Sequence, residues 1–300
     1  MCRSAKAMSV ASSRLRSAGE HVPSFVYGTA WKEDETERLT YLALEAGFRG
    51  VDTANQRRHY HEAGVGAAVA RAIAAGLVRR EELFLQTKFT YLPGQDPRWL
   101  AMTGRRPPYD PAADLATQVR QSFAVSLEHL QIDRLDSYVL HGPARPLGLA
   151  RADIDVWRTM EELHAAGKTR FLGISNVALD QLEELCAVAT TPPAFVQNRC
   201  FASDGWAGEV RAFCQEHGIV YQGFSLLTAN LAELRSPLIA RLAARVGRTL
   251  PQIVFRFALQ VGMLPLTGTT SVEHMREDLQ VYDFELSAED VHLIENITRG

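Results

Sequence analysis

Cysteine is scarce in this chain, and its placement excludes a disulfide-rich protein. Only four cysteines occur in 300 residues, namely Cys2, Cys186, Cys200 and Cys214, and no two of them form a C-x-x-C pair. Secreted disulfide scaffolds and zinc ribbons need closely spaced cysteines. We therefore expect reduced thiols and a cytoplasmic protein.

A charge excess and long apolar runs are also lacking. The formal net charge is −3, which gives no sign of a nucleic-acid surface. No apolar run reaches the length that spans a membrane. We therefore expect neither nucleic acid nor a membrane as a partner. Residues 1–16 contain no Asp or Glu, as in weak organelle transit signals, but we interpret residues 1–18 as a disordered terminus.

Short apolar runs alternate with helical periodicity along the rest of the sequence. Most of these runs hold β-branched or aromatic residues and predict eight strands, at 25–29, 48–53, 83–89, 135–141, 169–175, 194–199, 219–225 and 263–268. Strands alternating with helices indicate a parallel sheet. An open doubly wound sheet is the alternative, but no G-x-G-x-x-G follows an early strand. We predict a single-domain (β/α)8 barrel over residues 19–300.

Two segments depart from this regular alternation. Residues 91–113 are rich in Pro, Gly and Arg, and we expect a long loop over the barrel mouth, because loops of this length are usually functional or disordered. The segment 271–300 shows two short helical patterns, with Ser271 and Ser287 as expected N-caps.

Polar side chains stand at the ends of three of these runs. Asp52, Lys88 and His141 end the second, third and fourth runs, and Tyr60 lies in the loop after the second. Charged groups suit the cleft at strand ends better than a core. A lysine beside a tyrosine is expected to lower the phenol pKa, which would make the tyrosine a general acid. This set suits reduction of a carbonyl by a nicotinamide. His59 and His61 lack a third ligand, so we predict no metal site.

The motifs that contain these residues resemble those of the aldo-keto reductases. The matching segments run in the family's order: Gly28-Thr29-Ala30, Gly47 to Ala54, Thr87-Lys88, Leu140 to Pro143, and Gly173-Ile174-Ser175-Asn176. The resemblance covers about residues 20–298. It implies a barrel enzyme in which Asp52, Tyr60, Lys88 and His141 are the catalytic tetrad.

The resemblance also implies a cofactor, NADP(H), and the residues that hold it. Ser175, Asn176 and Gln197 would bind the nicotinamide carboxamide, and Phe224 stands where a stacking tyrosine is usual, before Ser225. Glu277 and Asp278 stand where a Glu-Asn pair contacts adenine. The remaining cofactor-binding residues that we expect lie at or beside a helix start, and they are Thr269, Ser271, His274 and Arg276. Phe224 has core packing as its alternative.

The chain departs from the family pattern near the tetrad. The family tyrosine follows the aspartate by five residues, whereas Tyr60 follows Asp52 by eight, so we expect the insert 56–58 to loop out. When the family spacing is counted forward from Asp52, the tyrosine position falls on Arg57, and when it is counted backward from the residues after the loop, it falls on His59. We nevertheless predict Tyr60 as the acid, because it is the only phenol in the loop. Thr90 and Gly142 replace frequent aromatics and should widen a substrate pocket. We expect its walls to include Trp31, Phe89, Trp99 and Gly142.

We predict NADPH-dependent reduction of aldehydes or ketones, with a small-molecule carbonyl as the partner. Two alternatives stay open. One is a barrel aldolase in which Lys88 forms a Schiff base. The other is a cofactor-binding regulatory subunit with negligible turnover, since the resembled family includes potassium-channel subunits of this kind. The sequence leaves the substrate and the oligomeric state open.

Overall fold

The computed structural model of this chain describes residues 22–298, and within them strands and helices alternate as the sequence predicts. The strands are β1 (Val26–Gly28), β2 (Gly50–Asp52), β3 (Phe84–Phe89), β4 (Leu135–Leu140), β5 (Thr169–Ser175), β6 (Phe195–Arg199), β7 (Val220–Phe224) and β8 (Leu264–Thr267). All eight predicted strands are confirmed, to within two residues at each end. The prediction for residues 1–18 lies outside the described residues.

The strand order is β1 to β8 in one closed, parallel barrel. In the paired register, Asp52 on β2 lies opposite Gln86 on β3, and Lys88 lies opposite Val139 on β4. Leu140 lies opposite Ile174 on β5. Since parallel strands end at the same edge of a sheet, this register brings the ends of β2, β3, β4 and β5 together.

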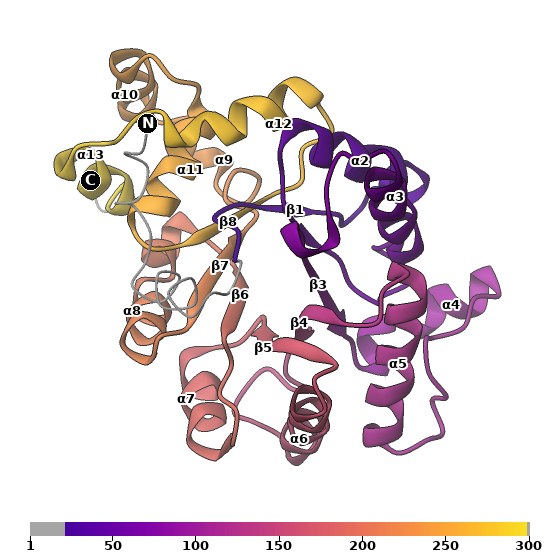
Figure 1. The fold of residues 1–300 in the computed structure, drawn as a ribbon. Coiled ribbons are helices and arrows are strands. Elements are labelled where there is room, and N and C mark those ends of the chain that lie inside the picture. The colour runs from indigo at the N-terminus through magenta and orange to yellow at the C-terminus, as the bar shows by residue number, and fades with distance from the viewer. Residues whose placement is uncertain (1–21, 299–300) are drawn as a thin grey trace. The chain divides into compact units, whose positions relative to one another are not determined.

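Compact packing divides the chain into two units, and Tyr27–Phe195 forms the first. Its helices are α2 (Thr36–Ala46), α3 (Glu62–Ala74), α4 (Pro97–Thr103), α5 (Leu115–Leu130), α6 (Arg151–Ala165) and α7 (Leu179–Val188). Gly47 ends α2 with φ of 119°, a conformation that side chains disfavour, so it acts as the expected stop. Helices α2, α3 and α5 lie side by side in sequence order (Figure 1).

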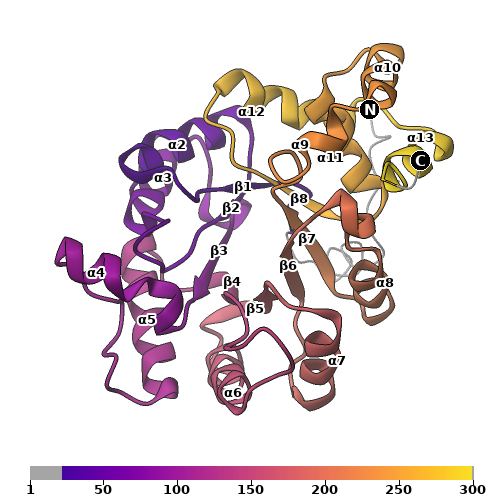
Figure 2. The same cartoon turned by 180° about the vertical axis from the view of Figure 1, so that it is seen from behind.

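The second unit begins at Val196 and includes the described residues before Tyr27. Its helices are α8 (Gly208–His217), α9 (Leu231–Leu234), α10 (Pro237–Val246), α11 (Leu250–Gln260), α12 (Val272–Leu279) and α13 (Ala288–Glu295). Ser271 and Ser287 accept backbone N–H groups at the starts of α12 and α13, so both predicted N-caps are confirmed. Helix α11 is buried on most faces and contacts α10, α12 and α13 (Figure 2).

The segment 91–113 is more ordered than a long loop. It contains a 3-10 turn at Leu92–Gln95 and the helix α4, which Asp96 caps by accepting the N–H of Trp99. The segment predicted as a long loop thus contains one short helix and one 3-10 turn. The assignment of residues 19–300 to one domain stays a prediction, since the chain packs as two compact units.

Candidate active site

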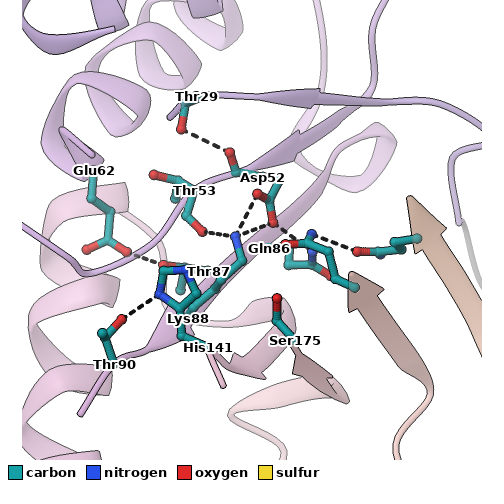
Figure 3. Close-up of polar contacts among 12 residues, drawn as sticks. Thr29, Asp52, Thr53, Glu62, Gln86, Thr87, Lys88, Thr90, His141 and Ser175 are labelled. Atoms are coloured by element: carbon teal, nitrogen blue, oxygen red, sulfur yellow. Dashed lines mark hydrogen bonds and ion pairs between the residues drawn. The ribbon is translucent and has the colours of Figure 1, made fainter. Parts of the chain in front are cut away.

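Lys88 and Asp52 form a buried ion pair near the ends of β3 and β2. The Lys88 ammonium donates to both Asp52 carboxylate oxygens at 2.6 and 2.7 Å, and to the carbonyl oxygen of Thr53 at 2.8 Å (Figure 3). Gln86, two residues earlier on the same face of β3, donates to Asp52 at 2.7 Å. The two charged side chains are at most 5% exposed. The parallel register of β2 and β3 thus pairs the side chain of Lys88 with that of Asp52.

A second buried carboxylate, Glu62, lies at the start of α3 and was missed by sequence reasoning. It accepts the Thr87 hydroxyl through one oxygen and contacts His129 Nδ1 at 2.9 Å through the other. Burial lowers the pKa of Lys88, while the charges of Asp52 and then Glu62 act to raise it. The sequence signal that could have pointed to Glu62 is its position in the first turn of the helix that follows the Tyr60 loop.

Tyr60 lies between Lys88 and His141. The Lys88 ammonium stands 5.3 Å from the centroid of the Tyr60 ring, and the His141 ring meets the same ring edge-on at 5.9 Å. Burial, and then the negative charge of Asp52, raise the pKa of Tyr60. The expected net lowering of this pKa is therefore wrong, because burial and then the Asp52 charge outweigh the attraction of Lys88 for the phenolate. The phenol stays protonated at neutral pH.

The insert 56–58 does not loop out, contrary to expectation. Gln56 is buried, donates to the Gly94 carbonyl at 2.8 Å and accepts the N–H of His59. Arg57 donates its N–H to the side chain of Gln95, and Arg58 pairs with Asp96. The insert is thus bound to the segment that follows β3. This bracing turns His59 toward Trp31, against whose ring it packs with centroids 3.8 Å apart.

His141 is held by its backbone and by Thr90. Its N–H donates to the carbonyl of Phe89 at 2.9 Å, and its own carbonyl accepts from the Asn176 amide at 2.8 Å. The Thr90 hydroxyl lies 2.7 Å from His141 Nδ1 (Figure 3). Burial and then the positive charge of Lys88 lower the pKa of His141 to about 3. The imidazole is therefore neutral at physiological pH.

A cavity of about 430 Å³ opens beside His141. Its lining is mostly apolar but includes polar side chains. The lining residues are Gln56, His59, Thr90, Tyr91, Pro93, Gly94, Leu115, His141, Gly142, Pro143, Ala144 and Ala152. Gly142 is thus at the cavity wall. The three aromatic wall residues lie elsewhere: Phe89 is fully buried against Tyr91 and Tyr109, Trp31 is 64% exposed, and Trp99 lies near Arg105.

Ser175 and Asn176 lie at the end of β5, where the Asn176 amide contacts the His141 carbonyl. Ser175 is buried, whereas Asn176 is exposed and adopts φ of +52°. The Asn176 amide also donates to the Ser175 hydroxyl at 3.1 Å. A positive φ at a non-glycine strand end is uncommon and is often found at ligand sites.

The other predicted cofactor residues belong to the second unit. Gln197 is buried and donates to Gln222 at 2.9 Å. Phe224 is half-buried with Arg199 5.9 Å from its ring, and Ser225 after it has φ of +57°. Core packing therefore does not account for the whole Phe224 ring.

The residues expected at the cofactor phosphate and adenine surround the start of α12. Thr269 accepts the Ser271 N–H, His274 and Arg276 are exposed, and Glu277 is half-buried. Asp278 is buried and accepts the Thr267 hydroxyl at 2.8 Å, and burial raises its pKa to about 6. This bond turns Asp278 inward, so its carboxylate is less available to a ligand than that of Glu277.

Lys32 is a further buried cation that sequence reasoning missed. It is 5% exposed, lies 5.1 Å from the Tyr27 ring, and burial lowers its pKa to about 8. Within residues 22–298 no cluster of three His, Cys, Asp or Glu side chains is arranged to hold a metal ion. No helix in that range has the length and apolar character needed to cross a membrane.

Comparison with known proteins decides the family. Residues 24–299 match the sequence profile of the aldo/keto reductase family. The chain belongs to the aldo/keto reductase family. Among curated family members, an aldo-keto reductase of Mycolicibacterium vanbaalenii is 32% identical over 89% of this chain and 84% of its own length. The NADPH-dependent codeinone reductase 1-5 of Papaver somniferum is 30% identical over 95% and 88%.

Solved aldo-keto reductase structures agree with the fold. The Bombyx mori aldo-keto reductase in complex with NADP aligns over 93% of this chain and 90% of its own, with a TM-score of 0.77 and 25% identity. The aldose reductase of Schistosoma japonicum has the same TM-score at 22% identity and covers 93% and 89%. The (β/α)8 barrel predicted from the sequence is thereby confirmed.

Proposed function

We propose that this aldo/keto reductase reduces aldehydes or ketones to alcohols with NADPH. The observation that carries the proposal is the buried Lys88–Asp52 pair beneath Tyr60, with a neutral His141 at the wall of an adjoining cavity. The codeinone reductases of Papaver somniferum are named as NADPH-dependent, and a Bombyx mori relative is described in complex with NADP. Both facts support NADP(H) as the cofactor.

Each unit carries polar groups of the kinds that bind parts of a nicotinamide nucleotide. The Asn176 side chain is exposed, and its amide oxygen has no partner among residues 22–298, so it can accept from a carboxamide N–H. Ser175 and Gln197 offer further polar atoms, and Phe224 with Ser225 offers a half-exposed ring at a strand end. Exposed His274 and Arg276 suit a phosphate, with Thr269, Ser271 and Glu277 beside them.

The chemistry divides between the cofactor and the side chains. Reduction adds a hydride to the carbonyl carbon and a proton to the oxygen, and NADPH supplies the hydride when bound. Tyr60 gives its hydroxyl proton to the oxygen as general acid. The Lys88 ammonium stabilises the phenolate that this transfer leaves, and Asp52 fixes the position of Lys88. Neutral His141 orients the carbonyl by a hydrogen bond.

The cavity indicates the substrate class. A volume of about 430 Å³ with a mostly apolar lining accepts a bulky or aromatic carbonyl compound. Gly142 and Thr90 leave room at this wall, because neither carries a bulky side chain. We also propose that the protein acts in the cytosol, because the described cysteines Cys186, Cys200 and Cys214 are reduced thiols.

A panel of small and bulky carbonyls, followed by loss of NADPH absorbance, tests the proposal. We expect turnover of several bulky carbonyls with NADPH and less with NADH. Cofactor binding without turnover of any carbonyl would favour the regulatory-subunit alternative. Trapping of a substrate on Lys88 by borohydride would favour the aldolase alternative.

A further inference from the structure

Thr90 follows β3 directly and points its hydroxyl at the imidazole of His141. The Oγ1 to Nδ1 distance is 2.7 Å, which is a good hydrogen bond, and Thr90 is only 6% exposed (Figure 3). Either atom can be the donor, depending on which ring nitrogen of His141 carries the proton. The direction of this bond therefore decides what the other ring nitrogen, Nε2, can do.

The state of His141 limits the choice. Burial and then Lys88 lower the pKa of His141 to about 3, so the ring is neutral and carries a single N–H. The Thr90 hydroxyl has no second partner among residues 22–298. If Nδ1 donated, the threonine proton would have no acceptor among residues 22–298. If Thr90 donates, its proton and the Nδ1 lone pair are both satisfied, which avoids a buried unpaired donor.

The surroundings of Thr90 fix its rotamer. Its carbonyl accepts the Tyr109 hydroxyl at 2.8 Å, which anchors the backbone. Its methyl group packs over Gly94, where an added Cβ would stand only 2.7 Å from Thr90 Cγ2. The absence of a side chain at Gly94 thus provides the space that the methyl group occupies. With the methyl group held there, the hydroxyl is directed at His141.

We propose that Thr90 is a positioning residue, whose hydroxyl donates to His141 Nδ1 and so fixes the imidazole tautomer that carries its proton on Nε2. This tautomer offers an N–H to a ligand in the cavity that His141 and Thr90 both line. The role of this tautomer in carbonyl reduction rests on the proposed function, in which the Nε2–H of His141 donates to the carbonyl oxygen of the substrate. The tautomer itself does not depend on that function.

Nitrogen-15 NMR of the histidine-labelled protein tests the proposal directly. His141→Gln identifies the His141 signals by their loss. Wild type and Thr90→Ser are expected to show a protonated Nε2 and an unprotonated Nδ1. Thr90→Val, which keeps the shape and loses the hydroxyl, should show a tautomer mixture. Gly94→Ala should do the same in part, because it displaces the Thr90 methyl group. Thr159→Val is the matched control, since it removes a buried threonine hydroxyl on α6.

Kinetics with NADPH and a carbonyl give a second readout. Thr90→Val should lower kcat by roughly tenfold, the worth of one hydrogen bond, and change KM less, whereas Thr90→Ser restores the rate. A wild-type spectrum with the proton on Nδ1, or a Thr90→Val protein with unchanged tautomer and kcat, would overturn the proposal. If the wild-type tautomer is as expected but no carbonyl is reduced, the assignment of Thr90 stands and the proposed function fails.

Discussion

The Lys88 ammonium and the Asp52 carboxylate lie 2.6 Å apart with almost no exposure to solvent. A buried pair of this kind is costly to break, because removing one charge leaves the other in a medium that cannot solvate it. We expect Asp52→Asn and Lys88→Met each to lower the free energy of unfolding by about 3–5 kcal/mol. The double variant should lose much less than the sum, since both charges are then absent.

Urea unfolding of the wild type, the two single variants and the double variant measures the coupling energy between Lys88 and Asp52. The matched control is Asp155→Asn, which breaks the exposed Arg151–Asp155 pair on α6 and should change the free energy of unfolding by less than about 1 kcal/mol. Single variants that behave like this control, with additive effects in the double variant, would show that the pair is not structurally important.

Asp278 makes the stability depend on pH. Burial raises the pKa of its carboxyl to about 6 from an ordinary value of 3.8, so between these values the folded state holds more protons than the unfolded state. Stability from this group is therefore fully present below about pH 4 and is lost as pH rises through 6. The loss amounts to about 3 kcal/mol as an order of magnitude.

The difference between wild type and Asp278→Asn isolates this group from other titrations. Asparagine still accepts the Thr267 hydroxyl but does not titrate. Unfolding measured without cofactor from pH 4 to 7 should give a steeper fall in stability for the wild type. Parallel curves for wild type and Asp278→Asn would contradict the burial argument.

Gly142 controls the size of the carbonyl that the cavity accepts. A Cβ at this position meets nothing closer than 3.6 Å, so Gly142→Ala should leave the activity nearly unchanged. Gly142→Trp should lower kcat/KM for bulky carbonyls by at least about tenfold, because the indole fills the cavity, and should spare small aldehydes. Steady-state kinetics with a small and a bulky substrate separate the cases. An equal loss for both sizes would exclude a steric role.

Arg276 and His274 are expected to set the preference for NADPH over NADH. Both are exposed on α12, so their attraction to a 2′-phosphate should weaken as salt rises. Arg276→Met should reduce the ratio of kcat/KM values by about two- to fivefold, the worth of an exposed ion pair. Arg241→Met, an exposed arginine on α10, is the control. A ratio near one in the wild type at low salt would contradict the assignment.

The sequence was sufficient for the barrel and for placing Asp52, Lys88 and His141 at or next to the ends of strands. Strands such as Thr169–Ser175 are short apolar runs bounded by helical periodicity, and this pattern depends on local residues alone. The strand ends then followed from parallel topology. Helix α4 was missed because Pro97 and Gly104 at its ends are read as loop residues, although Pro suits the first turn of a helix.

The electrostatic setting could not be predicted in the same way. Local patterns could not show that Gln56 would be buried against Gly94, or that the Glu62 charge would act on Lys88, because both depend on long-range packing. The direction of the Tyr60 pKa was mispredicted for the same reason. A nearby lysine lowers a phenol pKa only where burial and a balancing carboxylate do not prevail.

The identity of the proton donor is the central claim, and two adjacent residues compete for it. Tyr60 lies beside Lys88 and His141, whereas His59 packs on Trp31, and burial and then Arg58 lower the His59 pKa. The most direct measurement is kcat for a carbonyl with NADPH in Tyr60→Phe and His59→Gln, with cofactor binding followed separately. We predict a loss of roughly 10²–10⁴-fold for Tyr60→Phe with NADPH still bound, and a far smaller loss for His59→Gln. Near-full activity of Tyr60→Phe, together with an inactive His59→Gln, would contradict the account.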